Sequence, residues 1–140
     1  MQLHSAPVVL EVDRVDHAVD SVRMGRQGRD VDESLEQEVN LLHASICQGL
    51  SDPKRILMLY ALYDRPMHVN ELAEALHVPQ PTVSRHLKVL RERQLVAGER
   101  EGPSVRYSLA DERVIEALDI LRAVLLGTLS RQGHLAENMD

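Results

Sequence analysis

The amino-acid sequence predicts a mainly α-helical fold with one small β-hairpin, and three observations support this prediction. The apolar content is almost entirely aliphatic, because the 140 residues include no Phe, no Trp and only three Tyr. Such a composition suits packed helices better than a sheet sandwich. Apolar residues recur at helical spacing over most of the chain after residue 33, and two short strand-like runs flank a Gly-Pro turn.

The first two helices follow from apolar spacing and from capping residues. The first is expected to begin at Ser34, which has the spacing of a capping box with Gln37. Its apolar stripe comprises Leu35, Val39, Leu42, Ile46 and Leu50. A second helix is expected over about Pro53–Tyr63, with Ser51 or Asp52 as N-cap. Proline suits the first helical position because its missing N–H has no partner there.

Two further helices follow a break at Asp64-Arg65-Pro66. Asn70 is expected to cap a short third helix that ends at residues 77–79. Its buried side is predicted to consist of Leu72, Ala75 and Leu76. A fourth helix is expected to open at Pro81, with an apolar face made of Val83, Leu87 and Leu90. Thr82, Arg85 and Lys88 point away from this face, so the polar side of the helix should be free to bind.

The rest of the chain predicts a hairpin and a long helix. The runs Leu95–Glu101 and Ser104–Leu109 read as two strands joined at Gly102-Pro103. A last helix is expected from Asp111. Its apolar stripe comprises Val114, Leu118, Leu121, Leu125 and Leu129. This stripe is wider than one small neighbouring helix can cover.

One structured domain is expected at this length. We predict an N-terminal arm of uncertain structure over residues 1–33, the domain over residues 34–132 and a C-terminal tail over residues 133–140. The lone Cys47 cannot form an internal disulfide, and no signal-peptide pattern is present. No stretch approaches the roughly 18 apolar residues that span a bilayer. A cytoplasmic protein without a membrane role is therefore expected.

The net charge of −6 argues at first against a nucleic-acid partner, because duplex binding depends on basic groups near phosphates. The charge is, however, unevenly distributed. Residues 81–106 hold six basic and three acidic side chains, whereas residues 1–40 hold four basic and nine acidic ones. A local positive excess is what a DNA footprint requires.

A short helix, a turn, a helix with a polar N-terminal half and a basic hairpin follow one another in the order of a winged helix-turn-helix. This arrangement places one helix in the major groove of DNA and the hairpin against the adjacent groove or backbone. Arginine reads guanine, glutamine reads adenine, and hydroxyl groups and cations hold phosphates. The predicted DNA-binding residues are Gln80, Thr82, Ser84, Arg85, Lys88, Arg91, Arg100, Arg106 and Tyr107. For His86, packing, a backbone hydrogen bond and DNA contact all stay open.

The stretch from Ile46 to Leu109 closely resembles the ArsR/SmtB family of repressors. The segments GLSDPKRILML, ELAEAL and PQPTVSRHLKVLRERQLV carry the resemblance together. It implies a homodimer joined through the first and last helices, bound to a double-stranded DNA operator with inverted symmetry, and released by an effector. The predicted interface residues are Leu42, Ile46, Leu118, Leu121, Leu125 and Leu129.

The metal sites familiar in this family are missing from the sequence. Arsenic- and lead-type sensors carry two cysteines where this chain has Ala73 and Ala75. Zinc-type sensors place ligands in the last helix at positions that are here Arg113, Val124 and Gly127. Persulfide sensors need two cysteines, and this subunit has one. The effector and any cofactor therefore stay unknown.

Several alternatives are weighed beside the repressor hypothesis. His43 and Cys47 lie four residues apart and could join His134, Glu137 and His4 or His17 in a non-standard metal site. The simpler interpretation makes Cys47 a small buried hydrophobic residue. A winged-helix module that binds protein without DNA is a second alternative. No catalytic motif is present, so an enzyme is not expected.

Overall fold

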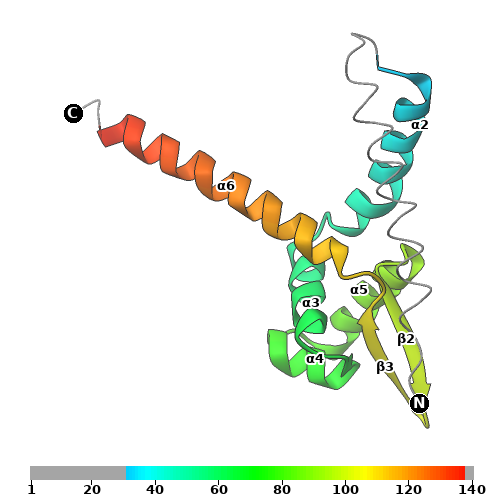
Figure 1. Ribbon diagram of the computed structural model, residues 1–140. Coiled ribbons are helices and arrows are strands. Elements are labelled where there is room, and N and C mark those ends of the chain that lie inside the picture. Colours follow the sequence, from blue (N-terminus) through cyan, green and yellow to red (C-terminus); the bar gives the residue numbers. More distant parts are fainter. Residues whose placement is uncertain (1–30, 138–140) are drawn as a thin grey trace, which may run out of the picture. The chain divides into compact units, whose positions relative to one another are not determined.

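The computed structural model describes residues 31–137, so most of the expected N-terminal arm lies outside the described residues (Figure 1). In chain order its elements are α2 (Glu33–Leu42), the π-helical segment η2 (His43–Cys47), α3 (Pro53–Asp64), β1 (Met67–His68), α4 (Val69–Leu76), α5 (Gln80–Glu92), β2 (Val96–Glu101), β3 (Ser104–Leu109) and α6 (Arg113–Glu137). The chain divides between Ala44 and Ser45 into two units.

Helix α2 in the first unit begins one residue earlier than expected. The Asp32 carboxylate accepts a hydrogen bond from the backbone N–H of Ser34 at 2.9 Å, so Asp32 is the N-cap. The predicted capping box of Ser34 and Gln37 is wrong, because an aspartate directly upstream satisfies the free N–H first. The expected continuous helix also changes at His43–Cys47 into π-helical turns, which hold more residues per turn and so shift the faces that follow.

The core of the second unit lies where α3, α4, α5 and the start of α6 meet a small sheet. Its buried hydrophobic residues are Met58, Leu59, Leu62, Met67, Leu72, Val83, Leu87, Leu90, Leu95, Val96, Ile115 and Leu118. The sheet has three antiparallel strands in the order β1-β3-β2. Strand β1 was not predicted, because two residues are too short to show a period. It pairs Met67 with Tyr107 and His68 with Arg106.

Helix α3 agrees with its predicted cap, whereas α4 does not. The Asp52 carboxylate accepts from the backbone N–H of Lys54 at 2.8 Å, as the Asp52-Pro53 sequence indicates. Helix α4 is capped at His68, not at Asn70, because β1 leads directly into it and the Glu71 carboxylate accepts from the His68 N–H at 3.2 Å.

The buried side of α4 is also rotated relative to the prediction. Leu72 is fully buried, but Ala75 is exposed and Ala73 packs against the core in its place. Packing against α3 and α5 therefore decides which flank of Leu72 is buried. Three apolar positions in so short a helix are too few to predict it.

A tight turn joins α4 to α5. His77 adopts the left-handed conformation with φ of 52°, and the N–H of Val78 reaches back to the Ala73 carbonyl at 3.1 Å. This is the Schellman type of helix end. Helix α5 then starts at Gln80 and buries Val83, Leu87 and Leu90, which confirms the predicted apolar face.

Helix α6 is longer than expected at its C-terminal end. It begins at Arg113, whose backbone N–H donates to the Asp111 carboxylate at 2.9 Å, and it continues past residue 132 to Glu137. Tyr60 of α3 donates a hydrogen bond of 2.6 Å to Asp119 and so ties the two helices together. Across the described residues, no helix is long and apolar enough to cross a membrane.

The apolar stripe of α6 divides between two environments. Leu118 was predicted to lie in the dimer interface. It is instead buried in the core of its own unit, so its side chain is not available to a second subunit. Leu121, Leu125 and Leu129 are 59%, 55% and 52% exposed, and they leave an apolar surface along the outer part of the helix.

Shortening Leu87 to Ala is expected to lower the free energy of unfolding by about 2–5 kcal/mol, because the side chain is fully buried and would leave a cavity. Glu92→Ala on the exposed side of the same helix should change it by less than about 0.5 kcal/mol. Urea denaturation followed by circular dichroism at one protein concentration measures both. Equal losses in the two variants would contradict the assigned core.

Candidate nucleic-acid interface

The surface of α5 opposite the core forms a continuous polar face. We call it the α5 polar face, and it comprises Gln80, Ser84, Arg85, Lys88 and Arg91. All five side chains are exposed. Because successive helical residues are about 100° apart, burial of Val83, Leu87 and Leu90 on one side turns this set outward. The face offers an amide, a hydroxyl group and three cations.

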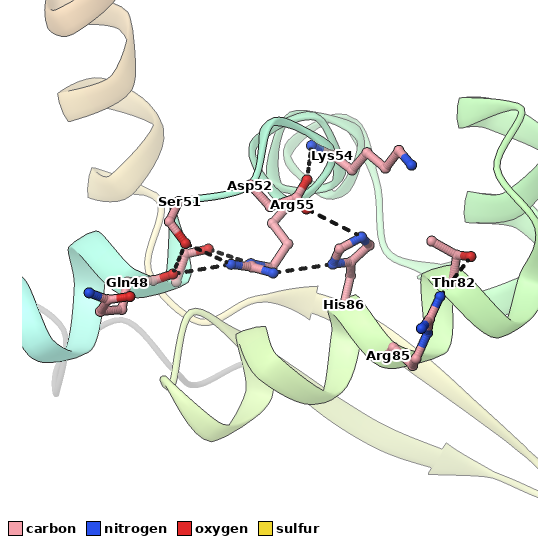
Figure 2. Close-up of polar contacts among 9 residues, drawn as sticks. Gln48, Ser51, Asp52, Lys54, Arg55, Thr82, Arg85 and His86 are labelled. Carbon is pink, nitrogen blue, oxygen red and sulfur yellow. Dashed lines mark hydrogen bonds and ion pairs between the residues drawn. The ribbon is translucent and has the colours of Figure 1, made fainter.

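Thr82 differs from the other predicted DNA-binding residues of α5. Its side chain is half-buried, and its Oγ1 accepts a weak hydrogen bond from Arg85 Nη2 at 3.3 Å (Figure 2). Thr82 therefore lies at the margin of the α5 polar face, where it helps to orient Arg85.

An arginine of α3 links α5 to the loop that precedes α3. Arg55 donates from Nε to the Gly49 carbonyl at 2.7 Å and from Nη2 to the Gln48 carbonyl at 3.1 Å. The same Nη2 lies 3.0 Å from Ser51 Oγ, and Nη1 lies 3.3 Å from His86 Nδ1 (Figure 2). All three nitrogens of the guanidinium group thus have acceptors within the protein.

His86 lies on the inner side of α5 and faces α3. Its side chain is only 14% exposed, and its Nε2 is 3.8 Å from an oxygen of Asp52. Burial is the main cause that lowers the pKa of His86 from its ordinary value of 6.5. Asp52 opposes this effect, whereas the positive charge of Arg55 adds to it. A neutral imidazole follows, with Nδ1 free to accept from Arg55. Of the options left open by the sequence, side-chain packing describes His86.

The hairpin of β2 and β3 carries its two arginines on opposite faces. Arg100 pairs across the strands with Val105, and Arg106 pairs with Glu99, so alternation separates them. Arg106 donates to the Glu101 carboxylate at 2.8 Å, which offsets its charge. Arg100 shares its face of β2 with Gly98.

The other arginine of this region, Arg91, connects α5 to the hairpin. Its Cζ atom lies 3.6 Å from where a Cβ on Gly98 would be, which is van der Waals distance, so the guanidinium group lies beside β2 at Gly98. Arg91 and Arg100 therefore lie toward the same face of β2, and with α5 they form a basic surface from which Arg106 is turned away.

Tyr107 is turned toward the protein interior. It is half-buried, packs against the core, and its Cε1 would lie 3.3 Å from a Cβ on Gly98. The phosphate contact expected for Tyr107 stays a prediction, whereas the role of its ring in supporting the hairpin is visible in the structure.

Comparison with known proteins assigns the family. Residues 52–97 match the family model "Bacterial regulatory protein, arsR family". The chain is 41% identical over 85 residues to the HTH-type transcriptional regulator NmtR of Mycobacterium tuberculosis, which covers 61% of this chain and 71% of that protein. The chain belongs to the arsR family. It is a transcriptional regulator with a winged helix-turn-helix fold.

Solved structures of similar chains agree with this family assignment. The crystal structure of M. tuberculosis Rv0081 superimposes with a TM-score of 0.60 at 33% identity, covering 67% of this chain and 95% of that one. The transcriptional repressor BigR from Xylella fastidiosa gives a TM-score of 0.58 at 27% identity, with coverages of 68% and 96%.

The candidate metal ligands are not gathered in the described part of this arsR-family protein. Within residues 31–137, no three His, Cys, Asp or Glu side chains lie close enough to hold a metal ion. His4 and His17 lie outside the described residues. Cys47 is exposed, which overturns its expected burial, because the π-helical turns of η2 change the face on which it lies. A site built on His43, Cys47 and His134 stays a hypothesis.

Sequence reasoning missed the contacts that hold α5 in place. Arg55 and His86 are 31 residues apart, and neither lies in a pattern that predicts their meeting. His68 was missed as well, although its Nδ1 lies 3.1 Å from the Val105 carbonyl and its Nε2 3.2 Å from Glu101. The sequence offered one hint of the Arg55–His86 contact: both are polar residues on the inner sides of amphipathic helices.

The pH dependence of stability is expected to report on His86. Because its pKa is lowered in the folded state, its contribution is present above about pH 6.5 and is lost as the pH falls through the lowered value. Between about pH 7.5 and 5.5, the free energy of unfolding should fall more in the wild type than in His86→Gln. Urea titrations at each pH measure this, and identical profiles would contradict the burial of a neutral imidazole.

Proposed function

We propose that this chain is a homodimeric repressor that inserts α5 into the major groove of an operator with inverted symmetry. The observation that best supports this proposal is the α5 polar face, which is exposed along the whole helix while the opposite face is buried. The groove admits one α-helix, and the side chains of this face suit base edges and phosphates.

The local charge supports the same proposal. The basic surface is built from residues 81–106, where basic side chains exceed acidic ones by six to three, although the chain as a whole is acidic. Arg85 lies beside Ser84 in the second turn of α5, and both side chains are exposed. We assign base reading to Gln80 and Arg85, and phosphate contact to Ser84, Lys88, Arg91 and Arg100. Arg106 is assigned a lesser role because Glu101 neutralises it.

The dimer is supported by the apolar surface of α6. Leu121, Leu125 and Leu129 are more than half exposed, together with Val124 and Leu126 on the same helix. Exposed leucines at helical spacing indicate a covered surface in the assembled protein. Leu42 of α2 is 51% exposed and is assigned to the interface with them, whereas Ile46 packs against the core and Leu118 lies inside it.

The signal that releases the repressor stays open. The family's usual metal-ligand positions hold Ala73, Ala75, Arg113, Val124 and Gly127 in this chain. We therefore propose a small molecule, a redox change or a differently built metal site as the effector. The cytoplasm is the expected compartment, since the operator would lie there.

Arg85→Ala is expected to weaken binding by about 1–3 kcal/mol and to relax sequence preference, because a base contact is lost. Lys88→Ala should weaken binding to all sequences alike and reduce the salt slope by about 1. Duplexes that the wild-type protein selects from a random library serve as probes, with fluorescence anisotropy as the readout.

Arg65→Ala is the matched control for these variants, because it also removes an exposed cation. Arg65 is not part of the α5 polar face and pairs with Glu71. It should leave DNA affinity unchanged. Absence of salt-dependent DNA binding by the wild type would favour a protein-binding module and overturn the proposal.

Leu125→Asp is expected to yield folded monomers, because the side chain is exposed in the subunit but would place a charge in the dimer interface. Leu118→Asp should instead unfold the chain, since Leu118 is 6% exposed in the core. Analytical ultracentrifugation with circular dichroism separates the two results. A Leu125→Asp variant with the mass of the wild-type assembly would contradict the assigned interface.

A further inference from the structure

The α5 helix is held from its inner side by the loop that precedes α3. We call residues 48–52 the α3 loop. It contacts α5 through the Arg55 guanidinium group, which has only hydrogen-bond donors and donates to two carbonyls and one hydroxyl of this loop. The fourth contact of Arg55 goes to His86 Nδ1 on α5 (Figure 2). Arg55 is thus the bridge between the loop and the helix.

A second contact holds the α3 loop against the far end of α5. Gly49 is buried, and a Cβ at this position would lie 2.7 Å from Leu95 Cδ1 and 3.5 Å from Arg93 Cγ. These residues follow directly after α5. The α3 loop is therefore linked to the middle of α5 through Arg55 and contacts the residues just beyond the C-terminal end of α5 through Gly49. These two contacts together fix the rotation of α5 about its axis.

The rotation of α5 decides where its polar face points. Ser84 and Lys88 are each two residues from His86, which places them about 200° around the helix from it. His86 therefore lies behind the α5 polar face and cannot contact DNA when that face does. Loss of the contact behind the helix would let its front turn or tilt by the small amounts that break bidentate base contacts.

We propose that Arg55 and His86 are a positioning pair for DNA reading, in which the neutral imidazole of His86 accepts from Arg55 and holds α5 in its reading orientation. This inference rests on the proposed function. It makes sequence discrimination depend on the protonation of a side chain that does not touch DNA. Protonation of Nδ1 would set an N–H against the guanidinium group, and the contact would be replaced by repulsion.

The groups that face His86 define when this happens. The Asp52 carboxylate at the N-cap of α3 is the one negative neighbour, and it favours the protonated imidazole. Lys54 and Arg55 of α3, and Arg85 of α5 itself, are positive and favour the neutral form. Burial acts in the same direction as the three cations. The hydrogen bond between Arg55 and His86 is therefore present at neutral pH and is lost as the pH falls.

Binding assays with four variants test the proposal. The probes are a duplex that the wild-type protein selects from a random library and a scrambled duplex of equal length. Arg55→Lys and His86→Leu should lose about tenfold in affinity for the selected duplex and far less for the scrambled one, because a charge-assisted contact behind α5 is lost. His86→Gln keeps an acceptor for Arg55 and should bind like the wild type at neutral pH. Arg65→Lys is the matched control and should show no change.

Two readouts distinguish positioning from a general structural role. First, the ratio of the two affinities should fall between about pH 7.5 and 5.5 in the wild type but stay level in His86→Gln. Second, the salt slope should be unchanged in Arg55→Gln, which removes the positive charge, because Arg55 donates to protein acceptors and not to phosphates. A reduced slope would make Arg55 a phosphate ligand and overturn the assignment.

The remaining outcomes separate the two proposals. If the wild type selects and binds DNA but Arg55→Lys and His86→Leu bind as it does, or if His86→Gln keeps the full pH dependence, the positioning pair is wrong while the repressor stands. If the wild type binds no duplex, the proposed function is wrong and the pair loses its role in DNA reading with it.

Discussion

Burial of the apolar face of α5 fixes which of its side chains reach the surface. Val83, Leu87 and Leu90 are almost fully buried among α3, α4 and the sheet, and this packing turns every cation of the helix outward. Neither intrinsic helix propensity nor charge would achieve this, since helix propensity does not select a face and the helix carries several like charges. Burial of the apolar side chains in the core thereby leaves the polar side chains of α5 on the surface that we propose to face DNA.

The hydrophobic core sets the approximate orientation of α5, and the polar contacts behind the helix define it more closely. Apolar packing tolerates small rotations of a helix, whereas hydrogen bonds of defined length do not. Arg55 connects the α3 loop to His86, and His68 connects β1 and the hairpin to the start of α4. Helix α5 and the hairpin are thus each anchored by a side chain from an element outside the proposed DNA-binding surface.

The fold explains how an acidic protein can present a basic surface. The positive excess lies in one continuous segment, residues 81–106, and the packing of α5 against the hairpin gathers part of it on one side. Arg106 is the exception, because strand alternation places it beside Glu99 and Glu101. Membership of the arsR family and the exposed basic surface both support DNA binding.

Periodicity in the sequence was enough to predict the main helices and the hairpin in order, the buried face of α5 and most of its polar face, because it reports how one element divides between core and solvent. Only the tertiary structure decided that His86 meets Arg55, that Arg100 and Arg106 part, that Leu118 is internal, and that Cys47 is exposed. These facts depend on pairing between distant segments, on strand register and on a π-helical turn. No local spacing encodes them.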